Sequence, residues 1–282
     1  MKSGKSMLLI ILGALLLLQG LLLPVEAEDT GVEAHNVLFL SSYSENFITT
    51  ADELEGIRSV LDTYGINLDT EFMDSKRFPD PENSQNFYQS LSYKLEHGYA
   101  YDGVIVSDDA ALQFAMDYQN DLFAGIPIYF IAINDYDRAM KAGQNPLMTG
   151  VYEKAALKDN IDLALEMIPQ ATQVVGIVDG TVTGIGDGKQ FTDVQEVYPD
   201  LTFTLLWSSD YTFGDLADQL QRYDDGTIIL FFTMSADKNA SYLNMNQQFA
   251  LVSENANVPV FRISVAGGIG TSESEVKYLG SV

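Results

Sequence analysis

The sequence has no cysteine and only two histidines in 282 residues, which removes several kinds of chemistry from consideration. Without cysteine there are no disulfides, no thiolate metal sites and no cysteine nucleophile. His35 and His97 fall at an expected strand start and at a helix end beside a glycine, where surface or capping roles are the usual ones. The chain also lacks the G-x-S-x-G, H-E-x-x-H and P-loop motifs. No catalytic residue, metal site or cofactor is therefore predicted.

Basic residues are also scarce, with 15 Lys and Arg against 40 Asp and Glu and a formal net charge of −25. Phosphate contacts need clustered Lys and Arg, so a nucleic-acid partner is excluded, and an anionic membrane surface would repel the chain. The ordinary effect of such charge is solubility.

Long apolar runs are limited to one, at the amino terminus. Lys2 and Lys5 precede the 17-residue stretch Met7–Leu23, and small residues follow it. This order is typical of a secretory signal, which predicts a signal peptide at residues 1–27 and a mature chain beginning at about Glu28. The alternative is an uncleaved anchor, because the run is at the short limit for spanning a bilayer. Both interpretations place the remainder outside the cytoplasm, in the periplasm or at the cell surface.

From Asn36 onward a short apolar run followed by a stretch with helical spacing recurs about nine times. This alternation indicates parallel α/β layers. Helices are expected at residues 49–61, 83–96, 110–122 and 155–168. The pattern breaks near residue 145, which predicts lobe 1 at residues 28–147, lobe 2 at 148–264, and a crossing between them at Leu147–Tyr152. A second crossing is expected at residues 264–270, and residues 265–282 would begin a return to lobe 1 that is cut short.

Several segments resemble a known family. The stretch from Val37 to Arg77 contains SSY, EGI and MDSKR, and YDGVIVSDDAALQF, TGVYE and VVGIVDGTVTG follow at Tyr101, Thr149 and Val174. They are similar to the ABC-transporter substrate-binding family of the type I periplasmic binding protein fold. The opening resembles most closely the extracytoplasmic sensor domains of histidine kinases and diguanylate cyclases. The resemblance implies two doubly wound parallel-sheet lobes with a hinge and a central cleft. The sequence departs from the family at its end, where the family returns to lobe 1, so the C-terminal part of lobe 1 is expected to be missing.

Nearly every predicted strand ends in hydrogen-bonding residues, and the carboxyl ends of parallel strands are where ligands bind in open α/β sheets. Eleven such residues are the predicted ligand-binding set: Ser42, Tyr43, Ser107, Asp108, Asn134 and Asp135 in lobe 1, and Asp179, Thr181, Trp207, Ser208 and Thr233 in lobe 2. Alternatives stay open for three of them: Asp108, with its neighbour Asp109, as a helix cap, Trp207 as core, and Asp179 as part of a turn. The stretch Gly184–Gly188 is predicted to be a turn, because its glycine spacing is wrong for a dinucleotide site.

A carboxylate at a strand end can bind an ammonium, helix N-termini suit a carboxylate, and Tyr43 or Trp207 can stack on a planar group. The expected ligand is an amino-acid-like small molecule, bound without catalysis as lobes close on it. The expected role is the sensor input of a signalling protein, whose partner would be a downstream kinase or cyclase module. The first alternative is a free binding protein of an importer, whose partner would be a membrane permease. A distant alternative is an exported hydrolase that uses paired carboxylates.

Overall fold

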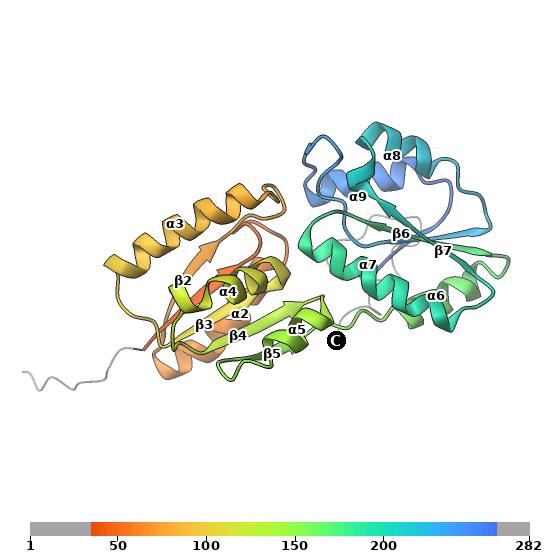
Figure 1. Ribbon diagram of the computed structural model, residues 1–282. Coiled ribbons are helices and arrows are strands. Elements are labelled where there is room, and N and C mark those ends of the chain that lie inside the picture. The colour runs from red at the N-terminus through yellow and green to blue at the C-terminus, as the bar shows by residue number, and fades with distance from the viewer. Residues whose placement is uncertain (1–34, 264–282) are drawn as a thin grey trace, which may run out of the picture. The chain divides into compact units, whose positions relative to one another are not determined.

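The structure, a computed structural model, describes residues 35–263. These residues form two parallel sheets (Figure 1). The first sheet has the strand order β2-β1-β3-β4-β5. Its strands are β1 (Asn36–Ser41), β2 (Asn67–Phe72), β3 (Gly103–Ser107), β4 (Ile128–Ile133) and β5 (Met148–Tyr152).

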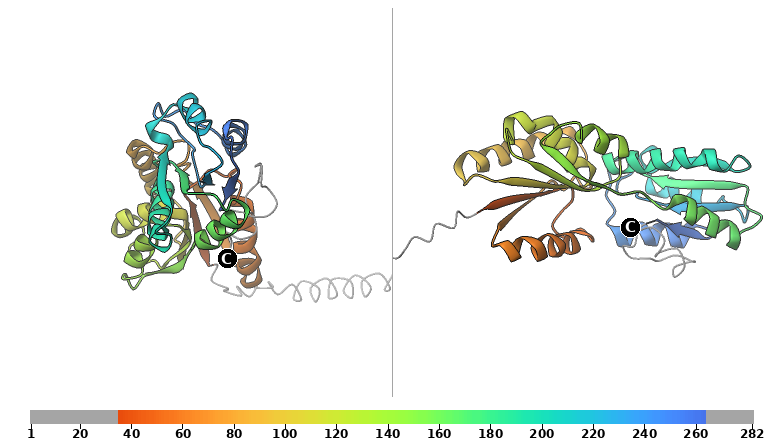
Figure 2. Two further views of the ribbon diagram at one scale, coloured as in Figure 1. Left: turned by 90° about the vertical axis from the view of Figure 1, so that its right-hand side faces the viewer. Right: turned by 90° about the horizontal axis from the view of Figure 1, so that it is seen from below.

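Helices cover the first sheet unequally. They are α2 (Thr50–Leu61), followed by the 3-10 turn η1 (Asp62–Tyr64), α3 (Pro81–His97), α4 (Asp108–Leu122) and α5 (Tyr136–Ala142). Figure 2 (right) shows α2 on one face and α3 and α4 on the other. Leu38 and Val104 of the strands meet Leu112 of α4 in a fully buried core on the α3–α4 face. On the opposite face Tyr129 of β4 is 49% exposed.

The second sheet has the order β7-β6-β8-β9 and is covered on both faces. Its elements are α6 (Leu157–Met167), β6 (Gln173–Val178), α7 (Val182–Val194), η2 (Gln195–Val197), β7 (Thr202–Trp207), η3 (Ser208–Asp210), α8 (Phe213–Leu220), β8 (Thr227–Phe231), α9 (Met245–Asn255) and β9 (Val260–Arg262). One core contains Ile161 of α6 and Phe191 of α7, and the other contains Leu216 of α8 and Phe249 of α9. Among residues 35–263 no helix is both long and apolar enough to cross a membrane. We call residues 35–152 the first lobe and residues 157–263 the second lobe.

The predicted fold class is confirmed. Strands β1 and β3 are central in the first sheet and β6 and β8 in the second, and every pairing is parallel. Strands that are apolar on both faces belong in such positions, because helices cover both sides.

Two local predictions were wrong. Leu147–Tyr152 was expected to cross between lobes, but Met148–Tyr152 is the edge strand β5, paired with β4. Gly184–Gly188 was expected to be a turn, but it lies within α7. The predicted signal peptide at residues 1–27 and the second crossing with the return at 265–282 lie outside the described residues.

Helix starts follow local side-chain chemistry. The carboxylate of Asp80 accepts the backbone N–H of Asn83, with Pro81 at the first helical position of α3. Thr212 and Asn244 form complete capping boxes at α8 and α9. Each such cap contributes about 1 kcal/mol to helix stability.

Gly150 of β5 offers a sharp test of the packing between β4 and β5. A Cβ atom at this position would lie 2.0 Å from the carbonyl oxygen of Phe130, so the strand pair would have to shift. We expect Gly150→Ala to lower the free energy of unfolding by about 1–3 kcal/mol, as overpacking does. In α2, a Cβ on Gly56 would have nothing within 4 Å, so Gly56→Ala should raise stability by about 0.5–1 kcal/mol. Urea unfolding measures both, and a wild-type midpoint for Gly150→Ala would contradict this packing.

Candidate ligand-binding site

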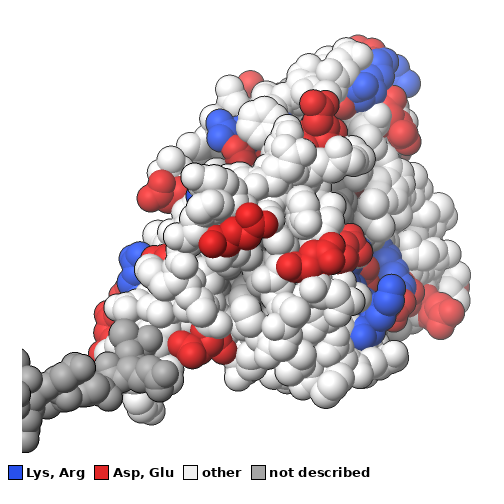
Figure 3. Space-filling model, turned by 60° about the vertical axis from the view of Figure 1, so that its left-hand side comes forward, with Lys and Arg blue, Asp and Glu red and all other residues white. Residues whose placement is uncertain are grey.

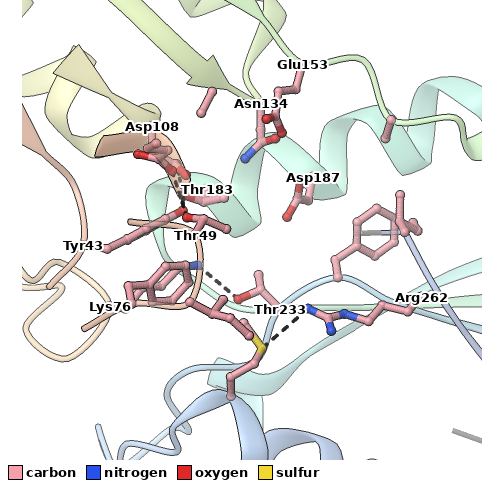
Figure 4. Close-up of a pocket in the computed structure, with 18 of the residues that line it drawn as sticks. Tyr43, Thr49, Lys76, Asp108, Asn134, Glu153, Thr183, Asp187, Thr233 and Arg262 are labelled. Carbon is pink, nitrogen blue, oxygen red and sulfur yellow. Dashed lines mark hydrogen bonds between the residues drawn. The ribbon is translucent and has the colours of Figure 1, made fainter. Parts of the chain in front are cut away.

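A pocket of about 430 Å³ lies between the carboxyl ends of the strands of both sheets (Figure 4). The first lobe contributes residues that follow β1, β2, β3 and β4, together with the first turns of α2. The second lobe contributes residues of α7, the end of β8 and the strand β9. The segment that connects the lobes supplies Glu153, Lys154 and Ala155. The volume suits a small organic ligand.

Asp108 reaches the pocket because its backbone turns sharply at the start of α4. It has a left-handed φ of 70°, a conformation that Asp tolerates better than most residues, and it is 7% exposed. Its carboxylate accepts the hydroxyl of Thr183 at 2.8 Å and the N–H of Asp109 at 2.8 Å. The Oγ of Ser42 caps Ala111 of the same helix at 2.7 Å. Asp108 thus faces the pocket while Ser42 satisfies the helix end.

Asp109, the neighbour of Asp108, does not line the pocket and instead binds the backbone of the segment that follows β4. Its carboxylate accepts the N–H groups of Asn134 at 3.3 Å and Asp135 at 3.1 Å, and it pairs with Arg138 at 3.3 Å. The register of β4 shifts between Phe130 and Ile133, around Ala132 with a left-handed φ of 56°. Such a bulge redirects the strand end, and Asn134 then lines the pocket.

Lys76 crosses from the first lobe into the second. The loop after β2 places its Nζ 3.1 Å from Thr181 Oγ1, 3.0 Å from Thr233 Oγ1 and 3.8 Å from the carboxylate of Asp179, and Lys76 is only 4% exposed. Asp179 is fully buried and also accepts the N–H groups of Thr181 at 3.0 Å and Ser235 at 2.8 Å. Burial alone would raise the pKa of Asp179, but the Lys76 charge and these hydrogen bonds outweigh it and lower that pKa.

Helix α7 approaches both lobes closely because it carries glycines. A Cβ on Gly184 would lie 2.2 Å from the carbonyl oxygen of Asp179, and a Cβ on Gly186 would lie 3.2 Å from the N atom of Asp135 in the first lobe. Farther along the helix, Gln190 donates to the carbonyl oxygen of Asn134 at 2.8 Å. Helix α7 therefore presents Thr183 and Asp187, one turn apart, to the pocket.

The wall of the pocket formed by β9 carries a positive charge, opposite to that of the acidic residues on α4 and α7. The guanidinium of Arg262 lies 4.2 Å from the ring centre of Phe249, and its Nη2 is 3.7 Å from the sulfur of Met245. Burial lowers the pKa of Arg262 to about 10, so it stays charged at neutral pH. Phe232 and Ile263 add apolar surface beside it. The pocket thus has a cationic and apolar wall facing an acidic one (Figure 4).

The carboxyl groups around the pocket disfavour one another's ionised forms. Burial and the Asp108 charge raise the pKa of Asp109 to about 7. Burial, with the charges of Asp108, Asp109 and Asp179 and against that of Lys76, raises the pKa of Asp187 well above its usual value. Burial likewise raises the pKa of Glu53 and of Glu153. These groups come from three helices, α2, α4 and α7, and from the connecting segment, so acidic groups surround the pocket on several sides.

Four residues of the predicted set line the pocket: Tyr43, Asp108, Asn134 and Thr233. The other seven do not line the pocket, and each has a structural contact within the protein. Ser42 and Ser208 donate to backbone carbonyl oxygens, Ser107 donates to Glu53, Asp135 caps α5, Thr181 caps α7, Asp179 pairs with Lys76, and Trp207 packs beside Gly188. Whether the lining residues bind a ligand stays a prediction.

Sequence reasoning missed the residues that reach the pocket from positions other than strand ends. Thr183 and Asp187 lie on a helix that was expected to be a turn, and Arg262 lies within β9. Lys76 is part of the MDSKR segment, which was noted only for its resemblance. A polar residue in an otherwise apolar strand such as VFR was the available signal for Arg262.

No model of a known protein family matches the sequence, and a search of curated proteins found no significant match. Solved structures do match. A tryptophan-bound ABC domain from Streptococcus pneumonia is 13% identical, over 81% of this chain and 74% of that one, with a TM-score of 0.57. The fold is that of the type I periplasmic binding proteins.

Two further structures with this fold were solved without a ligand and with a polyol, respectively. The ligand-free, open form of a substrate-binding protein from Clostridium difficile is 13% identical over 82% of this chain and 75% of that one, with a TM-score of 0.51. A carbohydrate transporter from Acidothermus cellulolyticus, with myo-inositol bound, is 11% identical over 81% and 73%, with a TM-score of 0.52. These similarities establish the fold, and they do not identify the ligand of this chain.

The Lys76–Asp179 pair can be tested by a double-mutant cycle. Lys76→Met leaves the Asp179 carboxylate buried without its cation, which should lower the free energy of unfolding by about 3–5 kcal/mol. Adding Asp179→Asn should restore part of this loss, because the uncompensated charge is then gone. Lys154→Met, which removes an exposed lysine at the pocket rim, should change stability by less than about 0.5 kcal/mol. Equal effects of the two lysine variants in urea unfolding would contradict a stabilising role for the pair.

The pocket carboxyls also predict how stability depends on pH. A carboxyl whose pKa is raised in the folded state contributes stability below its unfolded pKa of about 3.9–4.3, and this is lost as pH rises through the folded pKa. Asp179, with a lowered pKa, acts oppositely, but only below about pH 4. We therefore expect the free energy of unfolding, without ligand, to fall between pH 5 and pH 8, and to fall less steeply in Asp187→Asn. A free energy of unfolding that rises over this range would contradict raised pKa values for the pocket carboxyl groups in the folded protein.

Proposed function

We propose that this chain is an extracytoplasmic solute-binding domain that holds an amino-acid-like small molecule between its two lobes and captures it by lobe closure. The observation that carries the proposal is the pocket itself, which is lined from both lobes and the segment between them. A ligand there contacts both lobes at once, so its binding favours their closed arrangement.

The chemistry of the walls supports a zwitterionic or amphipathic solute. Asp187 and Asp108 on one side and Arg262 on the other offer opposite charges, and Phe47 and Phe232 offer aromatic surface. On the face shown in Figure 3 the acidic side chains are dispersed among uncharged residues and a few lysines and arginines. The pocket differs from this face in combining charged groups with apolar walls.

The role after capture has two candidate partners. The similarity to a carbohydrate transporter favours a membrane permease as the partner. The resemblance of the MDSKR region favours a kinase or cyclase module that reads lobe closure. Genes for a permease and an ATPase beside this one would support the importer, and a reading frame with a membrane span and a kinase or cyclase would support the sensor.

Titration calorimetry against amino acids, amines, sugars and hydroxybenzoates tests capture. We expect at least one amino-acid-like compound to give saturable heat with one site per chain, and Ala155→Trp, which fills the pocket, to abolish it. Ala100→Trp, at an exposed loop position, is the matched control and should bind normally. Turnover of a compound without saturable binding would instead support a hydrolase, and retained affinity in Ala155→Trp would move the site elsewhere.

A further inference from the structure

The carboxylate of Asp187 lines the pocket without a hydrogen-bond or ion-pair partner in the described part of the chain. Asp187 is half-buried on α7, its side chain points into the pocket, and no hydrogen bond or ion pair to it exists among residues 35–263 (Figure 4). The buried cation in the neighbouring region, Lys76, is already engaged with Asp179, Thr181 and Thr233. A carboxylate in partly dry surroundings is costly unless a cation or donor meets it.

Two further acceptors are directed toward the same space. Figure 4 shows the side chains of Asn134 and Glu153 on the same side of the pocket as Asp187. Neither side chain has a hydrogen-bond partner among the described residues. An ammonium group has three N–H donors and no acceptor, so two carboxylates and an amide oxygen complement it.

The rest of the pocket determines what carries that ammonium. The guanidinium of Arg262 has no acceptor atoms, so the β9 wall offers no partner to a ligand's ammonium group at that position, and the acceptors lie toward α7. Phe232, Met245 and Ile263 line the same wall and favour an organic body over a hydrated metal ion.

We propose that Asp187, with Glu153 and Asn134, binds the ammonium group of the ligand. The ligand class is therefore small organic ammonium compounds with an apolar body, which are amines or amino acids. This inference rests on the proposed function, since it assigns a role to one wall of the same pocket. Asp187 is the specificity-determining residue of that wall, because it selects for a positive charge.

Titration calorimetry with three phenyl compounds that differ in their charged groups tests the proposed ammonium site. L-Phenylalanine carries both an ammonium and a carboxylate, phenethylamine keeps the ammonium alone, and 3-phenylpropanoate keeps the carboxylate alone. Myo-inositol and Ca²⁺ complete the set as a neutral polyol and a metal cation. We expect binding by one or both ammonium compounds, and affinities weaker by roughly tenfold or more for 3-phenylpropanoate, inositol and Ca²⁺.

The variant Asp187→Asn should lower the affinity for the ammonium probes by roughly tenfold or more. The protein should stay folded, because Asn has nearly the same shape as Asp. Asp193→Asn removes the same charge from an exposed position of the same helix, and it should bind like wild type. This control separates a local contact from the effect of net charge.

The outcomes separate this inference from the proposed function. Saturable binding of inositol, 3-phenylpropanoate or Ca²⁺ as tight as that of the ammonium compounds would overturn the proposed ammonium site. If the tight ligand were inositol or 3-phenylpropanoate, the proposed solute-binding function would still hold. Full affinity of the ammonium probes for Asp187→Asn would overturn the role of this residue in the same way. Absence of binding by every probe, and by the wider panel of solutes, would overturn both.

Discussion

A buried ion pair joins the two lobes of this protein. Lys76 leaves the loop after β2 in the first lobe and meets Asp179 at the end of β6 in the second, with the hydroxyls of Thr181 and Thr233 completing its contacts. Because both charges are buried, neither lobe could move away without leaving one of them unpaired or bringing in water. A second hydrogen bond between the lobes, from the Tyr43 hydroxyl to that of Thr183 at 3.0 Å, lies beside this pair at the pocket. Any movement of one lobe away from the other would have to break these contacts.

Helix α7 is the second element on which the site depends. Glycines at 184, 186 and 188 are costly in a helix interior, by about 1 kcal/mol each relative to alanine. The close packing that these glycines allow offsets this cost. A Cβ atom on Gly184, Gly186 or Gly188 would lie against Asp179, Asp135 or Trp207, respectively. This close approach carries Thr183 and Asp187 to the pocket and places Gln190 against the first lobe. The helix therefore serves as the surface on which the two lobes meet.

The fold was predictable from the sequence because buried parallel strands are apolar on both faces and end in polar residues, patterns that local spacing records. The same pattern found Tyr43, Asp108, Asn134 and Thr233 in the pocket, but it could not tell them from Ser42 and Ser107, whose hydroxyls are used within the first lobe.

Which strand-end residue is left for a ligand depends on hydrogen bonds between segments far apart in the chain. The residues that the sequence did not reveal depend on such distant contacts still more. The stretch 184–188 was expected to be a turn after a strand, but it is part of α7, whose Phe191 packs in the core of the second lobe and whose Gly186 lies against Asp135 of the first lobe.

The most direct test of the central claim, that the space between the lobes is a solute site, is a crystal structure of the protein with its tightest-binding small molecule. We expect electron density for that molecule between α7 and β9, in contact with side chains of both lobes and with an ammonium group against Asp187. Density for the bound molecule on the outer surface of either lobe, with the pocket between Asp187 and Arg262 filled by water alone, would contradict it.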